Sequence, residues 1–457
     1  MPLSDFPGEI LLEISDYLGN AEINALALTN SQLYNFLNKY LYRRDMTGVC
    51  HSLRWGAYNG VEATVQRAVA AGQHLDPFPK LFHSALTSAA YRGHVRLVEL
   101  LLEVDGINPN YPEVPPLVKA VIGGHSDIVE LLLAVVNINP NIRDISSGSP
   151  LHWACGIGHV HIVKQLLARD DIDLNALGFG GSGPATPLIA ACQNNHLEIV
   201  NLLLAKEGID VNLCNIDRET PLMEAVKTGS ERVVKSLLAR DDLDPNIVDS
   251  TGDHVLVYSA FRGHIEIVRL LLDRPDIDPN FAAGRGSTGS HTALMKACQE
   301  DELDIIKLLL EKEGIDVNRQ DNAGRTALCI AADFSLDAVK LLLGRADTDP
   351  NIRDNDGRTP LFRACCTSQL SVVNLLLEKA NIDPNAGDSS GFTPLAAACF
   401  SVNEDIVHLL VSRQDTDPNP VDDTGVSLLD QVIENITPWI GVEIESLLRC
   451  AIATKEL

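Results

Sequence analysis

The stretch that decides the fold is SPLHWACGIGHVHIVKQLLARDDIDLN, residues 149–175. Ser149 is a favourable N-cap, and Pro150 suits the first helical position, where a missing N–H leaves no hydrogen bond unmade. Gly158 ends this short helix, because glycine readily adopts the left-handed conformation that closes helices. A second helix carries apolar residues at helical spacing over 162–167. The stretch therefore predicts two short helices followed by a turn at 173–175.

A leucine equivalent to Leu151 recurs along the chain at intervals of 31 to 38 residues. These anchor leucines are Leu86, Leu117, Leu151, Leu188, Leu222, Leu256, Leu294, Leu328, Leu361 and Leu395, with fainter copies at Leu53 and Leu428. One helix pair cannot bury its own apolar face, so stacked copies must supply the core. The third residue after each anchor is nearly always Ala, which indicates a close contact between neighbouring helices.

A period near 33 residues with Thr-Pro-Leu-x-x-Ala resembles the ankyrin repeat. The resemblance implies an all-α fold, an ankyrin-repeat solenoid of helix pairs with β-hairpin-like fingers. We expect a degenerate first ankyrin-like unit at 47–80, about ten ankyrin repeats over 81–425, and a C-terminal capping unit at 426–457. Trp439 and Ile440 are expected to close the last unit. Charged residues at the finger tips, Asp144 and Asp321 among them, are expected to be solvated.

Two glycine-rich stretches match the G-x-G-x-x-G pattern of dinucleotide-binding loops, GFGGSG at 178–183 and GRGSTG at 284–289. Such a loop needs a buried strand before it and a long helix after it. Both stretches instead follow polar Asp-x-Asn turns and fall in the two longest intervals between anchors. They are therefore predicted to be flexible finger extensions, and the alternative use left open is contact with a partner protein.

The cysteines and histidines follow the repeat. Five cysteines lie four residues after an anchor, where other repeats have Val or Ala: Cys155, Cys192, Cys298, Cys365 and Cys399. Five histidines lie eight residues after an anchor: His94, His125, His159, His196 and His264. The resemblance implies a structural hydrogen-bonding role for these histidines, and Cys in that slot is predicted to be a buried small residue. We expect no metal site, no cofactor and no catalytic residue, and we do not expect an enzyme.

The second, fifth and sixth residues after an anchor share one helix face. Because the second position accepts Lys, Trp, Glu and Tyr, it is predicted to face solvent. The resemblance implies that this face lines a groove that holds a target protein. The expected groove residues are Trp153, Ile157, Tyr258, Phe261, Arg262 and Phe400, with Tyr58 and Tyr91 in the same register. The alternative is that some of these side chains pack against a neighbouring finger.

Residues 1–46 lie outside the repeat and show three short helical patterns. Phe6-Pro7, Glu9-Ile10-Leu11 and the later leucines resemble an F-box, although Phe6 replaces the usual Leu and the later Trp is absent. The resemblance implies a small three-helix domain that docks on the adaptor subunit of an SCF-type cullin–RING ubiquitin ligase. Its expected adaptor-binding residues are Pro7, Ile10, Leu11, Ile14 and Leu18. The protein would then be a substrate receptor; the alternative is an ankyrin scaffold whose N-terminal helices cap the solenoid.

The composition limits the partners. The 457 residues carry 62 acidic and 36 basic side chains, a formal net charge of -26, which opposes binding to nucleic acid or to an anionic membrane. No signal sequence or membrane-spanning stretch is apparent. We therefore expect a monomer in the cytoplasm or nucleus whose partner is a protein.

Overall fold

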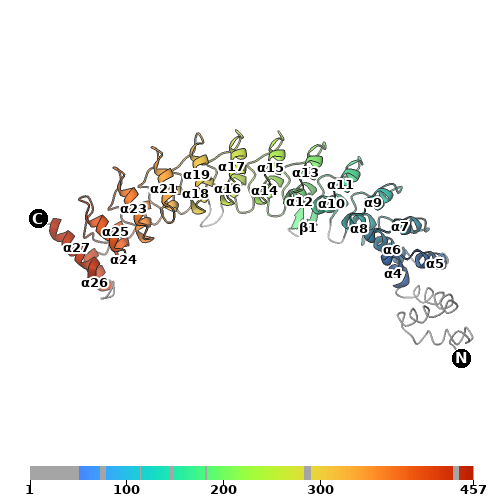
Figure 1. Ribbon diagram of the computed structural model, residues 1–457, viewed down its shortest axis with the longest axis horizontal. Coiled ribbons are helices and arrows are strands. Elements are labelled where there is room, and N and C mark those ends of the chain that lie inside the picture. The colour runs from blue at the N-terminus through green and yellow to red at the C-terminus, as the bar shows by residue number, and fades with distance from the viewer. Residues whose placement is uncertain are drawn as a thin grey trace, which may run out of the picture. The chain divides into compact units, whose positions relative to one another are not determined.

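The computed structural model describes residues 51–72, 79–113, 115–144, 148–180, 183–282, 290–435 and 442–455. These residues form helices α4 to α27 and one two-stranded sheet, and they divide into two compact units, unit 1 up to Ile216 and unit 2 from Asp217 onward (Figure 1). The expected F-box-like domain at 1–46 lies outside the described residues. So do its expected adaptor-binding residues, Pro7, Ile10, Leu11, Ile14 and Leu18.

The described residues of unit 1 form five helix pairs and one pair of short strands. Its elements are α4 (His51–Asn59), α5 (Glu62–Gly72), α6 (Pro79–Arg92), α7 (Val95–Leu102), α8 (Pro116–Gly123), α9 (Ser126–Leu133), α10 (Pro150–Ile157), α11 (Val160–Leu167), β1 (Gly178–Gly180), β2 (Gly183–Ala185), α12 (Pro187–Gln193) and α13 (Leu197–Leu204). The first helices of the pairs, α4 to α12, pack in one row, and the second helices, α5 to α13, pack in another (Figure 1).

Unit 2 repeats this two-row arrangement. Its elements are α14 (Pro221–Lys227), α15 (Glu231–Leu238), α16 (Val255–Phe261), α17 (Ile265–Leu272), α18 (Ala293–Gln299), α19 (Leu303–Leu310), α20 (Ala327–Ala331), α21 (Leu336–Leu343), α22 (Pro360–Cys366), α23 (Leu370–Leu377), α24 (Pro394–Phe400), α25 (Glu404–Val411), α26 (Leu428–Asn435) and α27 (Val442–Lys455). Each helix contacts its pair partner and the equivalent helices of adjacent repeats. The all-α solenoid predicted for the repeat region is thereby confirmed.

The first helices begin as the sequence predicts. The Ser149 hydroxyl accepts the backbone N–H of His152 at 3.2 Å, which caps α10. Six threonines cap later first helices in the same way: Thr186, Thr220, Thr292, Thr326, Thr359 and Thr393. Such a cap contributes about 1 kcal/mol to helix stability. Gly158 closes α10 with a φ of 95°, and the His196 ring lies 2.6 Å from where a Cβ would stand, so only glycine fits there.

The Asp-x-Asn turns join consecutive repeats. In each of seven repeats the Asn side chain donates from Nδ2 to a carbonyl of the next repeat and accepts an N–H of that repeat at Oδ1, an arrangement that we name the asparagine clasp. Its members are Asn110, Asn141, Asn175, Asn280, Asn318, Asn351 and Asn385. The predicted turn is confirmed, and the structure adds its role as a connection between repeats.

A second connection runs in the opposite direction. Arg345 holds Asp347 through Nε and Nη2 at 2.9 and 2.7 Å, and its Nη1 donates to the Leu310 carbonyl of the preceding repeat at 2.7 Å. The same arginine clamp recurs at Arg169, Arg274 and Arg413. The hydrogen bond from Arg345 lowers the pKa of Asp347. Each clamp satisfies a carbonyl at a helix C-terminus that has no partner within its helix.

Four finger aspartates are not solvated, in contrast to the expectation from sequence. Asp321 is 6% exposed, and its Oδ1 accepts the backbone N–H groups of Ala323 and Arg325 at 2.9 and 2.8 Å. Asp144, Asp249 and Asp354 are buried in the same way. A carboxylate that accepts two amides at a tight turn is part of that turn, so these charges are structural. Other tip residues, such as Arg353 and Asp356, are exposed as expected, whereas Arg325 and Arg358 are half-buried.

The described residues of the first glycine-rich stretch, 178–180 and 183, lie in two paired strands, where the sequence predicted a flexible extension. Strands β1 and β2 pair antiparallel, with Gly178 opposite Ala185 and Gly180 opposite Gly183. A Cβ on Gly178 would lie 2.5 Å from the His152 ring, so the strand approaches α10 closely because it has no side chain there. Most of the second stretch, 283–289, lies outside the described residues.

Two helices end unit 2 within the expected capping unit. Helix α27 packs on α25 and α26, and its Ile444 and Leu448 are fully buried. The Lys455 ammonium donates to the Thr416 carbonyl, which ties the end of α27 to the preceding turn. Trp439 and Ile440, which the sequence predicted to close this unit, lie outside the described residues.

Candidate protein-binding face

The five register cysteines are buried, as predicted. Burial raises the pKa of Cys399 to about 12 and also raises the pKa values of Cys155, Cys298 and Cys365. A thiol that stays protonated is a poor nucleophile and a poor metal ligand. In the described part of the chain, no three His, Cys, Asp or Glu side chains gather as a metal site would require.

Two register histidines connect first helices to the following repeat. His94 Nε2 lies 3.0 Å from the Tyr58 carbonyl, and His125 Nε2 lies 2.9 Å from the Tyr91 carbonyl. These imidazoles satisfy carbonyls at the ends of α4 and α6, positions where a helix leaves acceptors unpaired. The structural role implied for these two histidines is therefore observed, whereas the equivalent nitrogens of His159 and His264 have no hydrogen-bond partner.

The second, fifth and sixth residues after each anchor leucine form one side of the first helices, and we call this side the first-helix face. Its large exposed apolar residues include Trp55, Tyr58, Tyr91 and Ile157 in unit 1 and Phe261, Phe334 and Phe400 in unit 2. Of the predicted groove residues, Ile157, Phe261, Arg262 and Phe400 are exposed on it. Phe334, at 65% exposure, was missed, although the register that gave Ile157 would have found it.

In most described repeats the second position after the anchor does not face solvent as predicted. Trp153 and Tyr258 are half-buried and Glu224 is buried, although Trp55, at the same position after Leu53, is 57% exposed. The reason is the finger, whose turn lies against this position: the Tyr258 hydroxyl donates to Asp249 Oδ2, and the Trp153 indole would meet any Cβ on Gly148. A finger aspartate also pairs with Lys119 and with Arg363, whereas the buried Trp153 Nε1 has no hydrogen-bond partner.

At the start of unit 1 the first-helix face carries three aromatic side chains. Trp55 on α4 is 57% exposed, and with Tyr58 it lines a shallow hollow. The Arg92 guanidinium lies over the Tyr58 ring, 4.5 Å from its centroid, which is a favourable cation–π geometry. The arrangement offers an apolar surface bordered by positive charge.

In unit 2 the face carries a second such cluster on α16 and α18. The Arg262 guanidinium and the Lys296 ammonium lie 5.8 and 5.7 Å from the centroid of the Phe261 ring. Further along, Phe400 contacts Phe392 of its own finger at 5.1 Å between ring centroids. Phe400 thus matches in part the alternative of packing against a finger, whereas the Phe261 ring has charged neighbours.

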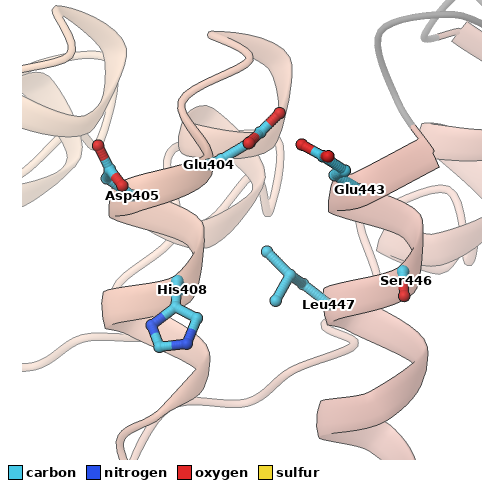
Figure 2. A pocket seen from close by; sticks show the side chains of 6 residues that line it. All are labelled: Glu404, Asp405, His408, Glu443, Ser446 and Leu447. Carbon is cyan, nitrogen blue, oxygen red and sulfur yellow. The ribbon is translucent and has the colours of Figure 1, made fainter.

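A different cluster lies between α25 and α27, where sequence gave no signal. Figure 2 shows Glu404 and Glu443 pointing toward each other above His408 and Leu447. A hydrogen bond shared with Glu443, together with the repulsion between the two charges, raises the pKa of Glu404. Both groups are at the surface, so the pair is a local acidic spot.

Comparison with known protein families agrees with this repeat geometry. The family model described as ankyrin repeats in three copies matches the chain over 53–144, 136–215, 188–283, 278–354 and 334–422. No F-box family model matches the chain, and the search of curated proteins gives no match. Within the described ranges no helix is both long and apolar enough to cross a bilayer. Ankyrin repeats are in general protein-binding scaffolds, and with matches that run from 53 to 422 this chain belongs to the ankyrin-repeat family.

Proposed function

We propose that the protein is a substrate receptor, in which the first-helix face holds a target protein and residues 1–46 dock on the adaptor of an SCF-type ubiquitin ligase. The observation that carries the target-binding part is that, in each unit, exposed apolar side chains recur at the fifth and sixth positions after the anchors, among them Tyr91, Ile157 and Phe261. Aromatic residues with a neighbouring Arg are the usual anchors of protein interfaces.

The ligase part is supported by the sequence of the first 46 residues. The F-box pattern is matched at Pro7, Glu9-Ile10-Leu11, Ile14 and Leu18, with Phe6 in place of the usual Leu. Such a receptor forms no bond itself. It would raise the concentration of a target lysine near a ubiquitin-charged enzyme, because both partners are held on one chain.

Co-purification of the full chain with the recombinant adaptor subunit tests the ligase part. We expect the wild type to retain the adaptor and Ile10→Asp to lose it, since a charge would be placed in an apolar contact. Glu13→Gln, a change in the same segment outside the expected contact set, is the control and should bind normally. If the wild-type chain does not bind the adaptor, the ligase role is contradicted, whereas the proposed target-binding face is unaffected.

The second candidate is an ankyrin scaffold without a ligase role, whose N-terminal helices cap the stack. The degenerate repeat that begins at Leu53 favours it, because terminal repeats of a solenoid need a covering face. Removing residues 1–46 separates the two candidates. The cap predicts that helices α4 to α7 lose hydrogen-exchange protection, whereas the receptor predicts that they keep it.

A further inference from the structure

The cations on the first-helix face stand out in a chain with 62 acidic side chains and a net charge of -26. The arginines of the clamps are neutralised, because each guanidinium is held by an aspartate two residues on. The turns that carry these clamps also expose further aspartates, such as Asp244, Asp278 and Asp349. Exposed arginines that form no ion pair also occur away from this face in the described residues, for example Arg143 and Arg353, but the cations beside Phe261 differ because they border an exposed aromatic ring.

Phe261 is bordered by two such cations. Arg262 is exposed, and neither it nor Lys296 has a carboxylate within 4.0 Å among the described residues. The Lys296 ammonium contacts only the neutral Gln299 Oε1, at 3.3 Å. Their neighbour Lys227 is different, because it pairs with Glu219. Two free cations thus flank a ring that is 41% exposed.

Unit 1 contains the same arrangement at the same register. Tyr91-Arg92 follows Leu86 at the positions where Phe261-Arg262 follows Leu256. Tyr91 is exposed, and Arg92 forms no ion pair in the described ranges while it covers the Tyr58 ring at 4.5 Å. Two separate repeats therefore present an exposed aromatic residue followed directly by an unpaired arginine.

We propose that the first-helix face of unit 2 binds an acidic protein segment, in which an aromatic or aliphatic side chain packs on Phe261 and adjacent carboxylates pair with Arg262 and Lys296. This inference rests on the proposed function, because it names the chemical class of the target that the face holds. Charge complementarity selects this occupant: an apolar segment alone would leave both cations desolvated without partners. A nucleic acid is disfavoured because the net charge of the chain repels an extended polyanion.

A displayed library of random dodecapeptides, panned against the full-length protein, tests the proposal. We expect the selected peptides to be enriched in Asp and Glu and to carry a large apolar residue. Their affinity is then measured by fluorescence anisotropy on the wild type and on four variants. The double variant Arg262→Gln with Lys296→Gln should raise Kd about tenfold, since two exposed charge pairs are lost. Phe261→Ser should raise Kd at least tenfold.

The matched control is Arg232→Gln with Lys235→Gln, which removes the same two charges from the exposed side of α15 and should leave Kd unchanged. Neutral or basic selected peptides, or no enrichment over a blank surface, would overturn the acidic class. If those neutral peptides still depend on Phe261, the proposed target-binding face survives. If neither Phe261→Ser nor Tyr91→Ser changes Kd, the proposed function is overturned as well.

Discussion

At the scale of single residues, the asparagine clasp connects repeats through one side chain. Asn351 donates to the Asn381 carbonyl at 2.7 Å and accepts the Asp383 N–H at 2.9 Å, so it satisfies two backbone groups of the next repeat. Its own N–H donates to Asp349 Oδ1 at 2.9 Å, which fixes the turn that holds it. An amide side chain suits this position because it offers a donor and an acceptor together.

We therefore expect Asn351→Ala to lower the free energy of unfolding by about 1–3 kcal/mol, because two backbone groups lose their partners. The urea midpoint of unit 2, followed by circular dichroism, measures this. Asn374→Ala is the control, since Asn374 is exposed on α23 in the same repeat. Equal midpoints for the two variants would show that water replaces the clasp without loss.

Residues that every repeat shares were predictable from sequence. Ser149, Gly158 and Cys155 meet the same surroundings as their equivalents elsewhere, so spacing alone gave a cap, a helix end and a buried slot. The burial of Asp321 was not predictable in this way, because its partners are turn amides whose arrangement depends on the finger backbone. Likewise, the half-burial of Trp153 and Tyr258 depends on where a finger lies against the helix, which the helical register does not contain.

At the scale of elements, the contact between α25 and α27 brings two carboxylates together. Glu404 begins α25 and Glu443 lies in the first turn of α27, in the segment that departs from the repeat. Because the two residues share no register, the sequence gave no reason to pair them. Their repulsion opposes the packing of a helix whose apolar side is otherwise well buried.

The raised pKa of Glu404 predicts a pH dependence. A carboxyl whose pKa is higher in the folded state binds its proton more tightly there than in the unfolded state. The repulsion between Glu404 and Glu443 is therefore relieved, and the folded state is stabilised, as the pH falls from 7 through that pKa toward 4.5. We expect Glu443→Gln to melt at a higher temperature than the wild type at pH 7, with the difference disappearing near pH 4. Thermal melts at matched ionic strength measure it.

Two observations complete that experiment. Glu434→Gln, an exposed change on α26, is the control and should shift the melting temperature little at either pH. Each variant is compared with the wild type at the same pH, because the whole protein also loses stability as the pH falls. The cause is protonation of clamped aspartates such as Asp276 and Asp347, whose pKa values are lowered in the folded state. A Glu443→Gln variant that melts like the wild type at pH 7 would mean that solvent screens the pair completely.

At the scale of the whole molecule, the described helices of each unit pack mainly on adjacent repeats, so stability is approximately a sum of local terms. Leu395 in α24 is almost fully buried, and Leu395→Ala should remove about 2–5 kcal/mol by leaving a cavity. We expect hydrogen-exchange protection to fall in α22 to α27 and to persist in α16 and α17. Val442→Ala, an exposed change on α27, is the control. A uniform loss of protection across unit 2 would contradict the local picture.

The asparagine clasp also affects how such a chain can evolve. Both groups that each Asn engages are peptide atoms, which any following copy supplies whatever its side chains. A gene segment of one period can therefore be duplicated or deleted in frame without leaving a clasp unmatched. The number of repeats can therefore change while the residues that contact the target diverge. New binding specificities can arise in this way with the same connections between repeats.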